Sequence, residues 1–139
     1  MKYINDDGGR SAAGKKGVAG DCAVRAIAIA TGTDYQKVYD AINLMPKTKY
    51  KNKGTSNSRT GVYRSTVNLY MESIGWHWVP TMSIGSGCKV HMREDELPKG
   101  NIIVRLSRHF AAVLDGILHD THDCTRDGTR CVYGYWMKG

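Results

Sequence analysis

The sequence lacks any long hydrophobic run. It contains no stretch of about 18 consecutive apolar residues, and this predicts that no segment spans a bilayer. The first residues, MKYINDDGGRSAAGKKG, contain no apolar segment that could act as a signal peptide. We therefore expect a protein of the reducing cytoplasm with no membrane partner. In that compartment the four cysteines are expected to be free thiols, ligands or nucleophiles before they are disulfides: Cys22, Cys88, Cys124 and Cys131.

Internal repeats are also absent, and no shift in composition divides the chain into two domains. The 139 residues are 41% hydrophobic and 24% charged, which is typical of a globular protein. A chain of this length can bury one continuous core. The sequence therefore predicts a single domain over residues 1–139.

Acidic residues are scarce in the first half of the chain. Residues 1–64 contain 12 lysines and arginines against 5 acidic residues, whereas residues 65–139 contain 8 of each. The excess centres on PKTKYKNKGTSNSRTG, residues 46–61, which predicts a solvated basic loop. The alternative is a surface for an acidic partner. Because this stretch has one tyrosine and no stacking platform, it disfavours nucleic acid as that partner.

Glycine and capping signals frame the first predicted helix. Residues 1–19 are rich in glycine and polar residues, and we expect an irregular N-terminal arm there. The apolar stretch that follows predicts a helix over residues 22–31. Asp21, or Gly20 before it, can cap its first turn, and Gly32 is a natural stop after its last.

Two more helices are predicted before the middle of the chain. The capping-box pattern TDYQ, residues 33–36, opens the second helix, and Pro46 ends it. The third lies within GVYRSTVNLYMESIGW, residues 61–76, where apolar residues recur at helical spacing. This spacing places Ile74 on the inward face, and Gly75 closes the helix.

After these helices the pattern changes to strands. The dipeptide Asp115-Gly116, between two apolar runs, is the strongest hairpin signal in the sequence. Helices followed by strands predict an α+β domain in which N-terminal helices pack on a C-terminal antiparallel sheet. The strands are expected within residues 76–81, 101–107, 109–114, 117–121 and 131–136.

Cys22 stands at the first turn of the predicted helix, in GDCAVRAIAIATG. A thiol at a helix N-terminus meets the positive end of the helix dipole, which favours the thiolate. The neighbouring Asp21 opposes the thiolate unless its carboxylate is turned into the helix cap. Cysteine within an Ala- and Ile-rich helix is also a common packing residue. Both interpretations stay open at this point.

The predicted hairpin places a histidine beside a carboxylate. With a two-residue turn, paired residue numbers sum to 231, so His109 and Asp120 are diagonal neighbours on one face. Such an imidazole can accept a thiol proton while the carboxylate fixes its tautomer. His122, opposite His109, is an alternative base, and His119 faces the other side. A change of one residue in the turn would separate the pair.

The blocks GDCAVRA and RHFAAVLDGILHDT resemble the papain-like cysteine peptidase superfamily. The likeness is greatest to compact bacteriocin-processing peptidase domains and to short phage and bacterial proteins, and it covers roughly residues 17–32 and 100–136. The resemblance implies a papain-like fold with Cys22 as nucleophile, His109 as base and Asp120 as orienting acid. It implies hydrolysis of a peptide, isopeptide or related amide bond in a protein or peptide substrate, without a cofactor, and a host cytoplasm if the chain is phage-encoded.

One position departs from this family pattern. These families usually place a glutamine about six residues before the cysteine, where it donates to the oxyanion, but Lys16 stands there. The Cys22 backbone N–H can supply one donor, with Lys16, Lys15 or Asn5 as the second. Loss of an oxyanion donor typically costs about 10²–10³ in rate.

Three further hypotheses accompany the hydrolase. A papain-like scaffold without chemistry could bind a protein or nucleic-acid partner through its basic surface. Tryptophans could line a substrate groove, although core packing is the alternative for each: Trp76, Trp78 and Trp136. The segments HDTHDC and CKVH carry zinc-competent residues, but without the usual paired spacing, so we expect no metal: His119, His122, Cys124, Cys88 and His91.

Overall fold

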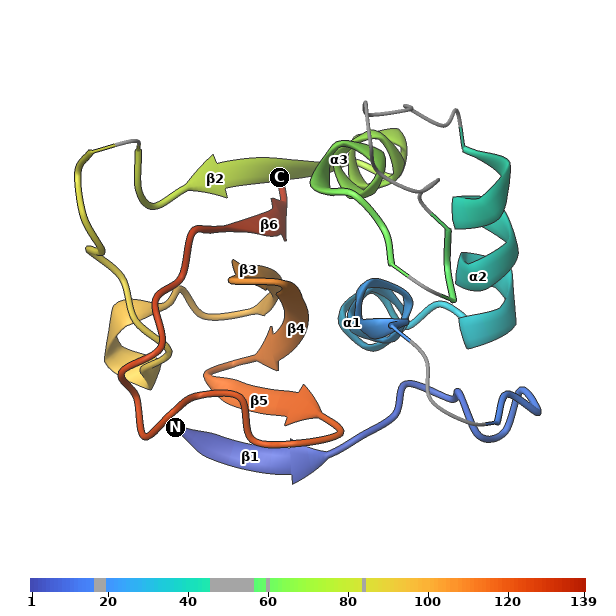
Figure 1. The fold of residues 1–139 in the computed structure, drawn as a ribbon, viewed down its shortest axis with the longest axis horizontal. Coiled ribbons are helices and arrows are strands. Elements are labelled where there is room, and N and C mark those ends of the chain that lie inside the picture. The colour runs from blue at the N-terminus through green and yellow to red at the C-terminus, as the bar shows by residue number, and fades with distance from the viewer. Residues whose placement is uncertain (17–19, 46–56, 60, 84) are drawn as a thin grey trace.

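The computed structural model describes the chain except for residues 17–19, 46–56, 60 and 84. The described residues form three α-helices and a six-stranded mixed sheet with strand order β1-β5-β4-β3-β6-β2. The α+β prediction is therefore confirmed. Figure 1 shows α1 between the sheet and α2, with α3 next to β2. Most of the expected basic loop, residues 46–61, lies outside the described residues.

The elements follow the predicted order with one addition at the N-terminus. The helices are α1 (Cys22–Thr31), α2 (Tyr35–Leu44) and α3 (Arg64–Ser73), with a short 3₁₀ turn at Glu94–Glu96. The strands are β1 (Lys2–Asn5), β2 (Trp76–Pro80), β3 (Asn101–Leu106), β4 (His109–Leu114), β5 (Ile117–Asp120) and β6 (Gly134–Lys138).

Strand β1 corrects two expectations. Residues 1–19 were expected to be irregular throughout, but Lys2–Asn5 pair with β5, and Asn5 lies opposite Asp120. This pairing is parallel, so the sheet is mixed and the expectation of a purely antiparallel sheet is wrong. The four-residue strand is held by hydrogen bonds to a strand more than a hundred residues away. Local sequence pattern cannot show such a partner.

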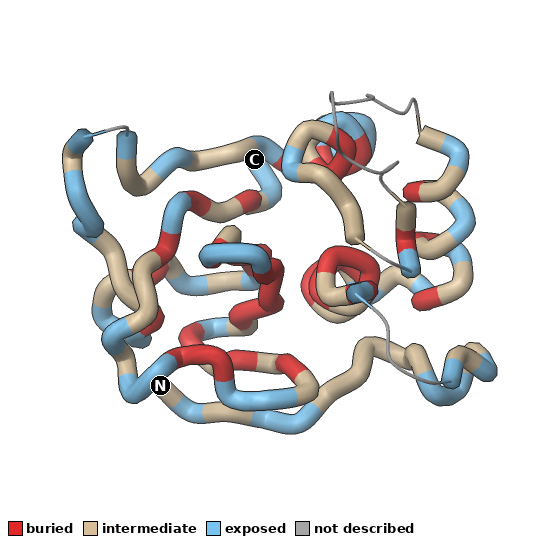
Figure 2. Tube along the Cα trace, in the orientation of Figure 1, coloured by how far each residue is buried: buried red, intermediate tan, exposed pale blue. Residues whose placement is uncertain are grey.

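The core has one layer on each face of the sheet. Toward the helices, Ile103, Phe110, Ala112 and Trp136 pack against α1 and its neighbours. The opposite face carries a second cluster, which includes Val104. Because α1 presents mainly alanine and isoleucine, its backbone can approach the sheet closely. Figure 2 shows the buried residues concentrated in α1 and the central strands.

The helix ends differ in detail from the prediction. Asp34, not Thr33, is the N-cap of α2, and its side chain accepts a hydrogen bond from the Lys37 backbone N–H at 3.2 Å. Asp34 fits this position because a short carboxylate reaches the free N–H groups of the first turn. Ile74 is 38% exposed, which contradicts its inward assignment. It follows the last residue of α3, where helical spacing no longer applies.

Two of the four cysteines are paired. A disulfide joins Cys88 to Cys131, and Cys22 and Cys124 are free. The expectation of four unpaired cysteines is therefore wrong for this pair. A backbone bridge between His91 and Cys131 aligns the two segments, which are distant in sequence. Because disulfides persist mainly in oxidising compartments, this pairing gives the cytoplasmic expectation no support. Among the described residues, no helix is long and apolar enough to cross a membrane.

Candidate active site

The β4–β5 hairpin forms the predicted two-residue turn. Leu114 pairs with Ile117, and the numbers of paired residues along β4 and β5 sum to 231, as predicted. Both turn residues take positive φ, 48° at Asp115 and 79° at Gly116, as a type I′ turn requires. This register places His109 and Asp120 on one face of the sheet, as predicted.

His109 and Asp120 form a buried hydrogen-bonded pair. The Nε2 atom of His109 lies 2.6 Å from Oδ2 of Asp120, and the residues are 9% and 4% exposed. The other carboxylate oxygen accepts the Thr121 backbone N–H at 2.7 Å. Burial by itself raises the pKa of Asp120, but these hydrogen bonds, led by that of His109, lower it below its ordinary value. Asp120 is therefore ionised at neutral pH and orients the imidazole.

Cys22 is the first residue of α1, as the sequence predicts. Burial raises the pKa of its thiol, but the His109 imidazole and the Phe110 backbone N–H hydrogen-bond to the thiolate and outweigh it. The positive charge of Arg25 acts in the same direction. The net effect is a lowered pKa, so Cys22 has the electrostatic surroundings of a reactive thiol rather than an inert core cysteine.

The His109 imidazole interacts with acceptors on more than one side. Burial lowers its pKa, but hydrogen bonds to Asp120, Cys124 and Cys22 raise it to about 11. Nε2 is the nitrogen that binds Asp120. Two thiols also act on the imidazole, that of Cys124 and that of Cys22. The raised pKa of His109 and the lowered pKa of Cys22 together favour a thiolate–imidazolium pair at neutral pH.

Asp21 does not oppose the thiolate as the sequence suggested. It occupies the N-cap position of α1, but its carboxylate turns to side chains instead of the helix N–H groups. One oxygen lies 2.7 Å from Arg25, and the other lies 3.1 Å from Arg10 and accepts the Tyr35 hydroxyl at 2.5 Å. Two guanidinium groups therefore compensate the negative charge next to Cys22.

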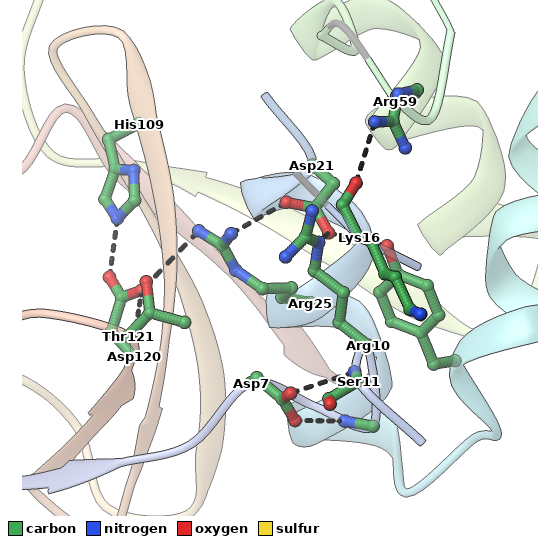
Figure 3. A network of polar contacts seen from close by, with 12 residues as sticks. Asp7, Arg10, Ser11, Lys16, Asp21, Arg25, Arg59, His109, Asp120 and Thr121 are labelled. Atoms are coloured by element: carbon green, nitrogen blue, oxygen red, sulfur yellow. Dashed lines mark hydrogen bonds and ion pairs between the residues drawn. The ribbon is translucent and has the colours of Figure 1, made fainter. Parts of the chain in front are cut away.

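Arg25 connects Asp21 to Asp120, the candidate orienting acid. Its second terminal nitrogen lies 3.7 Å from Oδ1 of Asp120. Figure 3 shows Arg25 between the two carboxylates, with His109 beyond Asp120 and Arg10 beyond Asp21. Sequence reasoning missed Arg25. The signal was available, because an Asp and an Arg four residues apart on a helix face each other.

The three side chains expected as second oxyanion donors lie elsewhere. The Nζ atom of Lys15 stands 4.2 Å above the centroid of the Tyr39 ring. The side-chain amide of Asn5 donates to the Thr121 carbonyl at 3.5 Å. Lys16 is exposed, and Figure 3 shows it on the far side of the Asp21–Arg25 pair from His109. The structure thus brings together the predicted triad but not these donors.

The tryptophans divide into two groups. Trp136 is fully buried, and its indole N–H donates to Asn68 at 3.2 Å. Trp76 is 7% exposed and belongs to the same core cluster. Both residues therefore pack in the core, and each also lines part of a surface pocket. Trp78 is half-buried and lines a surface pocket together with Arg105.

The predicted zinc-competent residues are dispersed. His119 pairs with Asp6 and His91 pairs with Glu96, each at 3.1 Å, while Cys88 belongs to the disulfide. A different group comes together, because ligand atoms of His109, Asp120 and Cys124 all lie within 4.8 Å of one another. These donors suit Zn²⁺ by type. In this structure, however, His109 and Asp120 bind each other.

Sequence reasoning also missed Arg105, whereas His122 lies beside His109 as predicted. The guanidinium carbon of Arg105 lies 4.5 Å from the centroid of Phe110, the residue after His109. Arg105 interacts electrostatically with Cys22. The exposed ring of His122, the alternative base, lies 5.2 Å from that of His109, whereas Asp120 directly bonds His109. The direct bond favours His109 as the base.

Comparisons of the chain with protein-family models, with curated proteins and with solved structures found no match. The papain-like resemblance therefore depends on the two sequence blocks alone. The chemistry of the site depends on the geometry around Cys22, His109 and Asp120.

Proposed function

We propose that the chain is a cysteine-dependent hydrolase of papain-like arrangement that cleaves a peptide, isopeptide or related amide bond. One observation carries the proposal. The His109 imidazole is bonded through Nε2 to buried Asp120, and it lowers the pKa of the Cys22 thiol at the N-terminus of α1. A nucleophile, a base and an orienting group in this order form the minimum set for covalent acyl transfer.

The acylation step follows from these positions. The Cys22 thiolate attacks the substrate carbonyl carbon, a C–S bond forms and the carbonyl electron pair moves onto oxygen. In an α-helix the first N–H groups have no intrahelical acceptor, so the Cys22 N–H can donate to this oxyanion. The His109 imidazolium then gives its proton to the leaving nitrogen as the C–N bond breaks, and a thioester is left on Cys22.

Deacylation reverses the proton transfer. Water attacks the thioester carbonyl while neutral His109 accepts its proton. The C–S bond then breaks, the carboxylic acid leaves and the thiolate–imidazolium pair is restored. Asp120 keeps the imidazole in one orientation through both steps.

The test is the alkylation rate of Cys22 by iodoacetamide between pH 5 and 10, read by peptide mass. In the wild-type chain we expect Cys22 to react well below pH 8.5, where an ordinary thiol is largely protonated. In His109→Gln its profile should move up to that ordinary range. His119→Gln is the matched control, because His119 lies on the same hairpin but pairs with Asp6. Identical profiles in the wild type and in His109→Gln would reject the thiolate–imidazolium pair.

Hydrolysis itself is tested on a mixed peptide library, with products read by mass spectrometry. Cleavage by the wild-type chain that is lost in Cys22→Ala supports the assignment. Loss in Cys124→Ser, with Cys22→Ala still active, would overturn it.

A further inference from the structure

A surface pocket of about 300 Å³ includes Arg105, which contacts Phe110 and the His109 carbonyl of the candidate site. We name it the arginine pocket. It is lined by Arg64, Trp78, Pro80, Met82, Arg105 and Tyr133. Two of these six residues are cationic, and the other four provide apolar or aromatic wall. The pocket lies at one end of the helix-covered face of the sheet, between α3, β2 and β3.

The arginine pocket is adjacent to the reacting groups. Arg105 pairs with Phe110 across β3 and β4, and its guanidinium stacks on the Phe110 ring. One terminal nitrogen of Arg105 also lies 3.5 Å from the His109 carbonyl oxygen. The Phe110 backbone N–H in turn hydrogen-bonds to the Cys22 thiolate. A substrate held by Arg105 is therefore held beside the thiol.

The positive charge in the arginine pocket has no carboxylate partner among the described residues. Arg64 stacks on Trp78, with its guanidinium carbon 5.2 Å from the ring centroid. Within the part of the chain that the structure describes, neither Arg64 nor Arg105 forms an ion pair with a carboxylate. Burial lowers the pKa of Arg105, and repulsion from Arg64 adds to this, while Cys22 raises it. Two like charges gathered without a carboxylate partner favour an anionic ligand.

We infer that the arginine pocket binds the carboxylate of an aspartate or glutamate in the substrate, next to the bond that Cys22 attacks. This inference rests on the proposed function. Guanidinium groups match carboxylates geometrically and form strong charge-assisted hydrogen bonds with them. The walls formed by Trp78, Met82 and Tyr133 suit the methylene groups of such a side chain. The chain is therefore selective for acidic peptides at this position.

The experiment compares two alkylating reagents that differ only in charge, N-bromoacetyl-glutamate methylamide and N-bromoacetyl-glutamine methylamide. The rate at Cys22 is measured for each by peptide mass, at low salt and pH 9, where an unassisted thiol also reacts. Since both reagents attack the same thiol, their rate ratio cancels the thiolate population. The ratio therefore tests the arginine pocket independently of the proposed function. It stays informative even if the pH profile of Cys22 alkylation shows no effect of His109.

We expect the wild-type chain to favour the glutamate reagent by about fivefold, as for a partly exposed ion pair. The ratio should fall toward one in Arg105→Gln and at least halve in Arg64→Gln. Because Arg64 is exposed, its variant tests the inference even if Arg105→Gln fails to fold. Lys2→Gln is the control, since it removes one charge from β1, at the opposite edge of the sheet from β2.

Three outcomes would overturn the inference. The first is a wild-type ratio near one. The second is a ratio that both arginine variants leave unchanged, or that Lys2→Gln lowers equally, since the effect would then come from net charge. The third is failure of both reagents to reach Cys22 at pH 9, because the arginine pocket would then not open on the thiol.

Discussion

Replacing Asp21 by asparagine should strongly destabilise the fold. The Asp21 side chain is 1% exposed and is surrounded by the guanidinium groups of Arg10 and Arg25 and the hydroxyl of Tyr35. Asparagine has the same shape but carries no charge. Its side-chain N–H groups would also face the N–H donors of the guanidinium groups and find no acceptor there. Breaking a buried ion pair in this way costs about 3–5 kcal/mol. The arginine side chains are 20% and 13% exposed, so we take the lower end, about 3 kcal/mol.

The magnitude can be measured by urea unfolding and by thermal unfolding, both followed by circular dichroism. For a domain of this size, 3 kcal/mol corresponds to a fall in Tm of about 10 °C. Asp34→Asn is the matched control, because it makes the same substitution at an exposed N-cap where asparagine caps equally well. That variant should change stability by less than about 0.5 kcal/mol. A loss below about 1 kcal/mol in Asp21→Asn would refute the reasoning, since the carboxylate would then not compensate buried charge.

Three further predictions concern the hairpin, the core and the histidine pair. Gly116→Ala should destabilise the chain by about 1–3 kcal/mol in urea unfolding, because φ is 79° and the added Cβ would meet Glu94 Cγ at 2.6 Å. Trp136→Ala, at a fully buried position, should cost about 3–5 kcal/mol in the same assay, and a loss below 1 kcal/mol would contradict its place in the core. Asp120→Asn should flatten the dependence of stability on pH. Because the folded pKa of Asp120 is lowered, its stabilising contribution is present above its unfolded pKa and lost as pH falls through the folded value. The folded pKa of His109 is raised to about 11. Its stabilising contribution is therefore full below about pH 6.5, the unfolded pKa, and is lost as pH rises toward 11. Equal slopes in acid for the variant and the wild type would contradict this linkage.

Much of the local structure was predictable because its causes are local. Alternating apolar residues around Asp115-Gly116 specify a two-residue turn, and the period of two then fixes which side chains share a face. The bond between His109 and Asp120 follows from that register. The helix that begins at Cys22 is likewise specified by its own alanine and isoleucine content and by Gly32 after it. The order of helices and strands was therefore predictable, and so was the pairing of His109 with Asp120.

Contacts between distant segments were not predictable, because no local propensity encodes them. Strand β1 exists through its pairing with β5, and the disulfide depends on two loops being brought side by side. The same reason explains why Asp21 was misjudged. Its sequence neighbour Cys22 suggests repulsion, but Arg10 approaches from the N-terminal arm and compensates the charge.

The sequence by itself determined the fold class, the hairpin register and the pairing of a histidine with a carboxylate, because periodicity and turn chemistry act over a few residues. Only the tertiary structure decided what surrounds Cys22. Arg25 reaches it from its own helix, but Phe110 and Arg105 come from strands more than eighty residues away. The reactivity of a thiol depends on the summed field of such neighbours. That field is a property of positions in space, and the order of residues along the chain does not contain it.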